Sequence, residues 1–202
     1  MIVRTFIISL FLIGLCNAAV SQVSNPALRD ELLAMEKVDQ DERRKCSTGD
    51  ADIQMKCLVE IAKTIDGPYT ERLEIIFHTY GFPNSKMVGQ DGQNAFMVLL
   101  QHTIGDGLRI KAINPITEAF KRKELSPQDY ANFIDRLRLH QGKGQLYGSG
   151  FEFKDGKMVL SKTHDIKNLE KRRRVLGLPP LSEYVKMLRE IYKLDVEVPN
   201  TD

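Results

Sequence analysis

Apolar residues recur at helical spacing along most of the chain. Asn25 followed by Pro26 is typical of a helix start, because the asparagine side chain can accept a hydrogen bond from the first turn and proline is tolerated there. The apolar residues after this start lie three or four positions apart: Leu28, Leu32, Met35 and Val38. The pattern predicts a helix that ends near Lys45.

Breaker residues divide most of the remaining chain into further helices. A second helix is expected over about residues 50–65, where residues 66–68 (Asp-Gly-Pro) should stop it, and Thr70 should cap a third helix that ends at Gly81. A polar loop then leads to the most apolar stretch, residues 95–100, which is expected to be central. Four more helices are expected over residues 110–120, from residue 127, over residues 165–176 and from residue 182.

One segment changes from the helical period to alternation. Residues 151–154 and 157–160 read as two short strands, and Asp155-Gly156 between them is typical of a two-residue hairpin turn. The predicted fold class is therefore mainly α, a single compact multi-helix domain with one small β-hairpin at about residues 144–161.

The first eighteen residues have the pattern of a secretory signal peptide. Arg4 precedes an apolar run, residues 6–15, that is too short to span a bilayer as a lone helix, and small residues follow it. Cleavage is expected near Ala18, which leaves residues 19–202 as one secreted or periplasmic helical domain without a transmembrane segment. Lipidation of Cys16 is an alternative that the bulky Leu15 before it disfavours.

Export changes what the cysteines can do. Only Cys46 and Cys57 remain after cleavage, and an oxidising compartment would let them form a disulfide that joins the first two helices. The alternative is two free thiols, with Cys57 packed on the apolar face of its helix. No Cys/His cluster, phosphate-binding loop or HExxH motif is present, so no metal or cofactor is expected.

The charge balance gives no reason to expect nucleic acid as a partner. The formal net charge is +2, and removal of the signal peptide, which contains Arg4 and no acidic residue, lowers it to +1. The basic run at residues 171–174 is interpreted as the solvated face of a helix. The expected partner is a ligand or protein of the cell envelope, whose identity the sequence does not give.

The densest group of glycines and hydrogen-bonding side chains lies at residues 135–150. Asp135 and Arg136 are adjacent and point about 100° apart on a helix, so one of them should face the core and form an ion pair, for example with Asp39 or Arg43. Gln145 and Tyr147 would share one face of a strand and bind a polar ligand with Arg136. The alternative is that their hydrogen bonds fasten the hairpin to the helices.

Gln101 and His102 end the most apolar helix, where buried polar groups need partners. Asp106 follows His102 at the i, i+4 spacing, so an uninterrupted helix would bring the two together as a general base and the carboxylate that orients it. Gly105 between them weakens this spacing argument. A structural histidine bonded to a neighbouring helix, or a metal ligand, are the alternatives.

Several of these blocks together resemble an uncharacterised, mostly bacterial family, the domain of unknown function 6624. The resemblance covers about residues 28–192, and its most specific part is Asp135-Arg136 followed by Gln145, Tyr147 and Gly148. The other matching positions are Asp39-Gln40 with Arg43, Gly81-Phe82-Pro83, Val88-Gly89, Gln101-His102, and Arg173 with residues 177–181. The family pattern continues Thr-Gln where this chain has Ser149-Gly150, and the resemblance implies homology but no reaction.

Two functions from different classes remain open at this point. The first is an exported binding or interaction module that recognises a polar ligand or protein partner, with Gln101, Gln145, Tyr147, Asp39 and Arg43 as candidate binding residues. The second is a hydrolase-like enzyme, in which His102 is the base, Asp106 or Asp135 orients it, and Arg136 stabilises negative charge.

Overall fold

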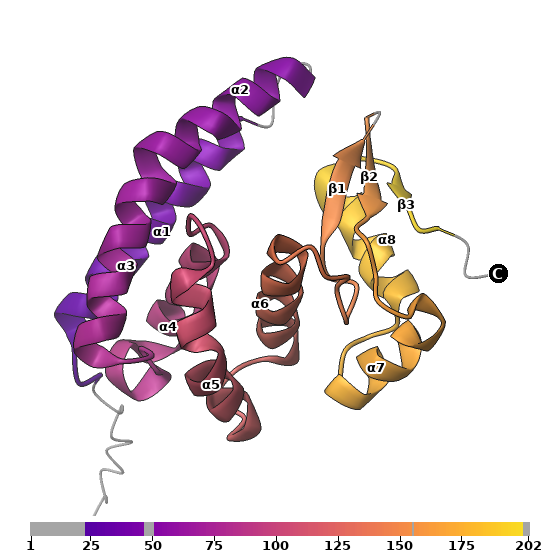
Figure 1. Ribbon diagram of the computed structural model, residues 1–202. Coiled ribbons are helices and arrows are strands. Elements are labelled where there is room, and N and C mark those ends of the chain that lie inside the picture. The colour runs from indigo at the N-terminus through magenta and orange to yellow at the C-terminus, as the bar shows by residue number, and fades with distance from the viewer. Residues whose placement is uncertain (1–22, 47–50, 155, 200–202) are drawn as a thin grey trace, which may run out of the picture.

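Helices form most of the chain in the computed structural model, which describes residues 23–46, 51–154 and 156–199 (Figure 1). The predicted fold class, mainly α with a small β-sheet, is confirmed. The predicted signal peptide with Cys16 and Ala18, the turn at residues 47–50 and the turn residue Asp155 lie outside the described residues.

The helical elements, in chain order, are α1 (Pro26–Lys45), α2 (Ala51–Ile61), the π-helical segment η1 (Ala62–Asp66), α3 (Gly67–Tyr80), α4 (Ser85–Gln101), α5 (Gly107–Lys121), α6 (Pro127–His140), the 3-10 segment η2 (Ile166–Asn168), α7 (Leu169–Leu176) and α8 (Leu181–Tyr192). The strands are β1 (Phe151–Lys154), β2 (Lys157–Leu160) and β3 (Val196–Glu197). We call α1–α6 the helical unit, and the three strands with η2, α7 and α8 the C-terminal unit.

The main hydrophobic core lies inside the helical unit and is built from α1, α3, α4, α5 and α6. Asn25 accepts a hydrogen bond from the Leu28 N–H at 3.1 Å, so the predicted start of α1 is confirmed.

The predicted apolar face of α1 is wrong at its last position. Val38 is 44% exposed, whereas the next residue, Asp39, is 1% exposed, because the helical repeat after Met35 points Asp39 toward the core and toward polar partners described below.

The expected break between the second and third helices is absent, and the chain runs through it as one continuous helical rod. Pro68 has no N–H, and its ring would collide with the carbonyl four residues earlier in a regular α-helix. The π-helical segment widens this turn, and the Gly67 N–H bonds instead to the carbonyl of Ala62, five residues back. Thr70, expected to cap a new helix, instead donates to the Asp66 carbonyl.

The C-terminal unit has a second, smaller core of its own. The hydrophobic residues that form it are Met158, Leu160, Leu169, Leu181, Val185, Leu188 and Val196. The predicted hairpin is confirmed as the antiparallel pair β1 and β2, in which Lys154 pairs with Lys157 and Gly156 has a φ of 76°. The short strand β3 was not predicted; it adds to β2 in parallel and makes a three-stranded sheet of order β1-β2-β3.

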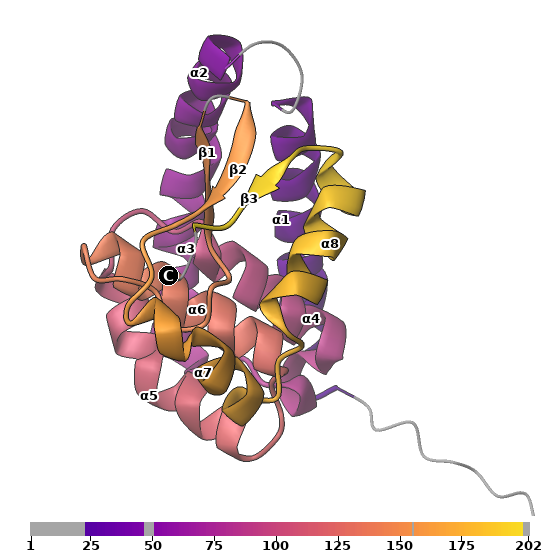
Figure 2. The same ribbon diagram turned by 90° about the vertical axis from the view of Figure 1, so that its right-hand side faces the viewer.

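The two units lie side by side, with α6 next to the C-terminal unit (Figure 1). In the view of Figure 2 the sheet, α7 and α8 lie in front of the helical unit. In the described ranges, no helix combines the length and the apolarity needed to cross a bilayer.

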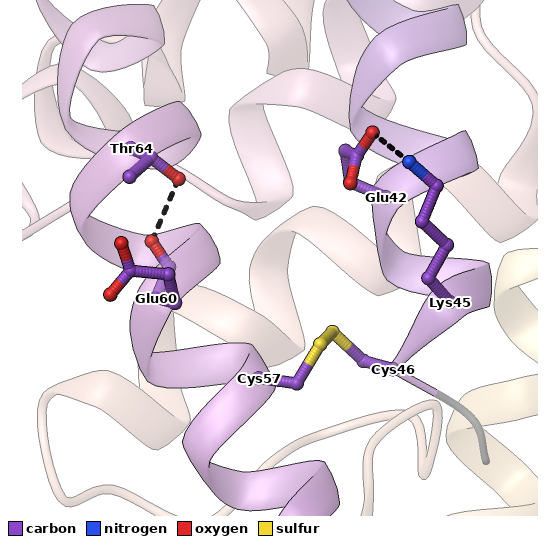
Figure 3. The surroundings of a disulfide bond; sticks show 6 residues. All are labelled: Glu42, Lys45, Cys46, Cys57, Glu60 and Thr64. Atoms are coloured by element: carbon purple, nitrogen blue, oxygen red, sulfur yellow. Dashed lines mark hydrogen bonds and ion pairs between the residues drawn. A yellow bond between two sulfur atoms is a disulfide. The ribbon is translucent and has the colours of Figure 1, made fainter.

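Cys46 and Cys57 form a disulfide that joins the end of α1 to α2 (Figure 3). Their Cα atoms are 5.4 Å apart, which is a usual separation for bridged cysteines. Cys46 is buried, and its N–H caps α1 by donating to the Arg43 carbonyl at 3.1 Å. The bridge therefore fixes the end of α1 two turns beyond the buried Asp39.

We expect replacement of both Cys46 and Cys57 by serine to lower the free energy of unfolding by about 2–3 kcal/mol, because the bridge closes a short loop in the unfolded chain. Denaturant unfolding of the mature protein measures the difference, and the wild type in excess reductant should match the variant. Two reactive thiols in denatured, unreduced protein would contradict the prediction.

Candidate functional site

A cleft of about 410 Å³ lies between the helical unit and the C-terminal unit. Its residues come from the end of α4, one face of α6, the loop that follows α6, the sheet and α8. They are Gln101, His102, Asn132, Arg136, Leu139, Ser149, Gly150, Phe151, Phe153, Met158, Ser161, Tyr184, Leu188 and Tyr192. Of the predicted site residues, Gln101, His102 and Arg136 line this cleft.

His102 is held by a carboxylate, but the carboxylate is Asp39 of α1 and not the predicted Asp106 or Asp135. The contact also fits the alternative of a structural histidine bonded to a neighbouring helix. The Nδ1 atom of His102 lies 2.9 and 3.0 Å from the two carboxylate oxygens of Asp39. This contact leaves Nδ1 as the proton donor and Nε2 as the atom with a free lone pair. The side chain of His102 is 20% exposed and reaches the cleft, and in the described part of the chain no hydrogen bond to Nε2 is present.

Asp39 is surrounded by further donors. Arg43 Nε donates to it at 3.0 Å and Gln40 Nε2 at 2.8 Å, and Arg43 also pairs with the buried Asp66. Burial by itself would raise the pKa of Asp39, but the hydrogen bond and charge of His102, with the charge of Arg43, lower it below its usual value. Asp39 is therefore ionised at neutral pH.

The predicted pairing of His102 with Asp106 is wrong, because the helix ends before His102 and the chain turns at Gly105. α4 stops at Gln101, Gly105 has a φ of 68°, and α5 begins at Gly107. Asp106 instead lies 3.4 Å from Arg109 and 3.3 Å from His140.

The loop that follows His102 is held by a buried arginine. Arg109 is almost fully buried and donates to the carbonyls of Thr103 and Gly105, both at 2.6 Å. Ile104 N–H donates to Thr70 Oγ1 at 2.8 Å, which ties the same loop to α3. These bonds fix the backbone directly after His102 and so limit the movement of its ring.

Arg136 is a cation without a partner in the cleft. It makes no hydrogen bond or ion pair with any residue that the structure describes, and its side chain is exposed to the cleft solvent. Because protein surrounds the cleft, burial lowers the pKa of Arg136, and the charge of Arg43 lowers it further. An arginine between nearby cations and without a carboxylate is suited to bind an anionic ligand group.

Asp135, the neighbour of Arg136, points away from the cleft and has a structural role. It is 1% exposed and accepts hydrogen bonds from the N–H groups of Leu146 at 2.6 Å, Tyr147 at 3.0 Å and Ser149 at 3.0 Å. Burial raises its pKa, and these N–H groups act in the opposite direction. The predicted catalytic role of Asp135 as the group that orients His102 is not what the structure shows, because its oxygens are used to hold this loop.

Gln145 follows the structural alternative rather than the ligand-binding one. The fully buried side chain of Gln145 donates to the carbonyls of Gly150 and Ser161, both at 3.0 Å, and accepts from the Gly150 N–H at 2.8 Å. Tyr147 lies in a separate hollow beside α7. The alternation expected for these two residues fails because only Gln145 forms a strand-like bridge, to Thr163.

The basic run at residues 171–174 is only partly solvated. Arg173 is fully buried, donates to the carbonyls of Pro179 and Tyr147, and stacks 5.2 Å from the ring of Tyr184. Arg172 donates to the carbonyls of Leu146 and Asp165. Both arginines therefore hold the loop that Asp135 also holds, and the interpretation as a solvated face is wrong for them.

The aromatic side of the cleft was not predicted from the sequence. Phe151 and Phe153 of β1 and Tyr184 and Tyr192 of α8 line it. The alternating phenylalanines of β1 were a signal for this face, because residues two apart on a strand lie on the same side. Within residues 23–46, 51–154 and 156–199, no group of three or more His, Cys, Asp or Glu side chains is placed to hold a metal ion.

The chain belongs to the family of unknown function DUF6624, whose pattern matches residues 26–197. The resemblance predicted from the separate blocks is thereby confirmed. Comparisons with curated proteins and with solved structures give no significant match. The match includes all the elements that form the cleft.

We expect Asp135→Asn to destabilise the fold by about 1–3 kcal/mol or more, because the amide group that replaces one oxygen cannot accept from the loop N–H groups. Thermal or denaturant unfolding measures the loss. Asp30→Asn is the matched control, since Asp30 makes only an exposed contact to Arg29 at 3.8 Å, and it should change stability by less than about 0.5 kcal/mol. Equal effects of the two substitutions would contradict the structural role of Asp135.

The lowered pKa of Asp39 predicts a pH-dependent contribution to stability. The folded state favours the ionised carboxylate, so the stabilisation is complete above the unfolded pKa of about 4 and is lost as the pH falls through the lower folded pKa. The difference in free energy of unfolding between wild type and Asp39→Asn should therefore shrink as the pH falls below about 4. Denaturant unfolding between pH 7 and pH 2.5 tests this, and a difference independent of pH would contradict it.

Proposed function

We propose that this member of the DUF6624 family is an exported hydrolase-like enzyme whose cleft acts on an anionic substrate. His102 is the general base, Asp39 orients it, and Arg136 binds the negative charge of the substrate. The observation that carries the proposal is the histidine at the cleft, whose Nδ1 is bound to a buried carboxylate and whose Nε2 has no hydrogen-bond partner among the described residues.

The reaction that this arrangement supports is attack of water on an ester or amide carbonyl. His102 Nε2 takes a proton from the water as its oxygen bonds to the carbonyl carbon, and Asp39 stabilises the imidazolium that forms. The bond between this carbon and the leaving oxygen or nitrogen then breaks, and His102 returns the proton to the leaving atom. The two products together contain the substrate and one water.

Arg136 supports the reaction through charge. A guanidinium can bind a carboxylate with two parallel hydrogen bonds, which fixes the orientation of the substrate as well as its position. The neighbouring Asp135 does not compete for it, because its oxygens accept from the loop N–H groups.

Two observations support the proposal that the enzyme acts outside the cytoplasm. The sequence begins with the pattern of a signal peptide that would be cleaved near Ala18. The two cysteines that cleavage leaves form a disulfide, which is common in oxidising compartments and rare in reducing ones.

The second candidate function is a binding module that uses the same cleft without a reaction. The partnerless Arg136 favours it, because a cation exposed in a cleft serves binding whether or not chemistry follows. The candidate ligands are polar molecules or protein segments of the cell envelope that contain an anionic group.

We expect His102→Gln to lower kcat/KM by about 10²–10⁴-fold on a chromogenic ester that contains a carboxylate, such as 4-nitrophenyl hemisuccinate, because the general base is lost. Arg136→Gln should mainly raise KM. Release of nitrophenolate measures both effects on the mature, disulfide-containing protein.

The control for this experiment is His78→Gln, since His78 lies exposed on α3 and does not line the cleft. This substitution should leave the rate unchanged. An unchanged rate in His102→Gln would contradict the enzyme proposal. Binding of anionic ligands without hydrolysis of any ester or amide would instead support the binding module.

A further inference from the structure

The two walls of the cleft differ in chemistry. The wall from α4 and α6 is mainly polar, and its side chains are Gln101, His102, Asn132, Arg136 and the apolar Leu139. The facing wall, from the sheet and α8, is mainly apolar, and its side chains are Phe151, Phe153, Met158, Tyr184, Leu188 and Tyr192. A substrate that contacts both walls therefore has a polar, charged part and an apolar part.

The apolar wall contains both buried side chains and aromatic side chains that are exposed to solvent in the cleft. Met158 and Leu188 are buried and belong to the core of the C-terminal unit, so they fix the base of this wall. Phe153 is 63% exposed and Tyr192 is 52% exposed, although both line the cleft. Large aromatic side chains gain most when their exposed surface is covered, so these two are suited to contact an apolar ligand group.

The size of the cleft limits the occupant. A volume of about 410 Å³ lies within the usual range of roughly 300–1,000 Å³ for small-molecule sites. The single partnerless cation that the described residues place in the cleft fits one anionic group rather than a polyanion. A small acid that carries one apolar body meets both conditions.

We propose that the substrates are small acids joined by an ester or amide bond to an aromatic or aliphatic body. The anionic group binds Arg136, the apolar body covers Phe153 and Tyr192, and the hydrolysable bond lies between them, within reach of His102. This inference rests on the proposed function, because it takes the cleft that contains His102 as the substrate site.

Three compounds with the same amide bond separate the two parts of the substrate. N-phenylacetylglycine has both the carboxylate and the aromatic body, N-acetylglycine lacks the body, and N-phenylacetylglycinamide lacks the charge. We expect the first to bind at least about tenfold more tightly than either of the others, since covering one ring and pairing one charge each contribute on that scale. Ligand-observed NMR titration of the mature, disulfide-containing protein measures the affinities, with His102→Gln used to prevent turnover.

Variants of the two walls give the matched comparison. Phe153→Ser and Tyr192→Ser should lower the affinity for N-phenylacetylglycine several-fold and leave that for N-acetylglycine unchanged. Arg136→Gln should reduce the affinity for N-phenylacetylglycine to that of the uncharged amide. Tyr80→Ser is the control, because Tyr80 is a similarly exposed aromatic residue on α3 that does not line the cleft.

The outcomes distinguish this inference from the proposed function. Equal binding of the acid and its uncharged amide, equal binding with and without the ring, or no binding of N-phenylacetylglycine would each overturn the inference. Tight binding of N-phenylacetylglycine to wild type and to His102→Gln, without release of glycine and phenylacetate by the wild type, would sustain the ligand class and overturn the enzyme proposal.

Discussion

The buried carboxylate of Asp135 is the interaction on which the arrangement of the cleft depends. It lies on α6 of the helical unit, and it accepts from three N–H groups of the loop that leads into the C-terminal unit. Loss of this acceptor would leave buried N–H donors unpaired, which is costly. Gln145, inside the loop, donates to the Gly150 carbonyl, and Arg173 of α7 donates to the Tyr147 carbonyl. The sheet and α8 are thereby held opposite α4 and α6, and the cleft lies between them.

A second buried carboxylate, Asp39, differs from Asp135 in the kind of group that it binds. Asp135 is satisfied mainly by backbone N–H groups, whereas Asp39 is bound to the side chains of His102, Arg43 and Gln40. Arg43 pairs with both Asp39 and Asp66, so two buried carboxylates share one guanidinium beside His102. The first carboxylate holds the loop beside the cleft, and the second holds the ring of His102, which lines the cleft.

Local signals in the sequence predicted the elements well, and the long-range contacts less well. The start of α1 at Asn25, the β1–β2 hairpin and the Cys46–Cys57 pair follow from residues near one another in the chain. The pairing of Asp39 with His102 spans 63 residues and depends on how α1 packs against α4, so spacing alone favoured Asp106 instead. Strand β3 has only two residues, which is too short for an alternating apolar pattern in the sequence. It forms through its pairing with β2.

The adjacency of Asp135 and Arg136 now has a physical reason. Neighbouring helical residues point about 100° apart. Because Asp135 points toward the loop after α6, where it accepts from the Ser149 N–H, Arg136 points into the cleft beside that loop. Gly150 contributes to the same region, since a Cβ there would lie 2.9 Å from Leu139 and 3.2 Å from the Gln145 Oε1 atom. The glycine lets the chain pass close to α6, and the cleft is lined at this point by backbone alone. The block that matches the family most specifically therefore holds the loop beside the cleft through Asp135 and Gln145, and it places the guanidinium of Arg136 in the cleft.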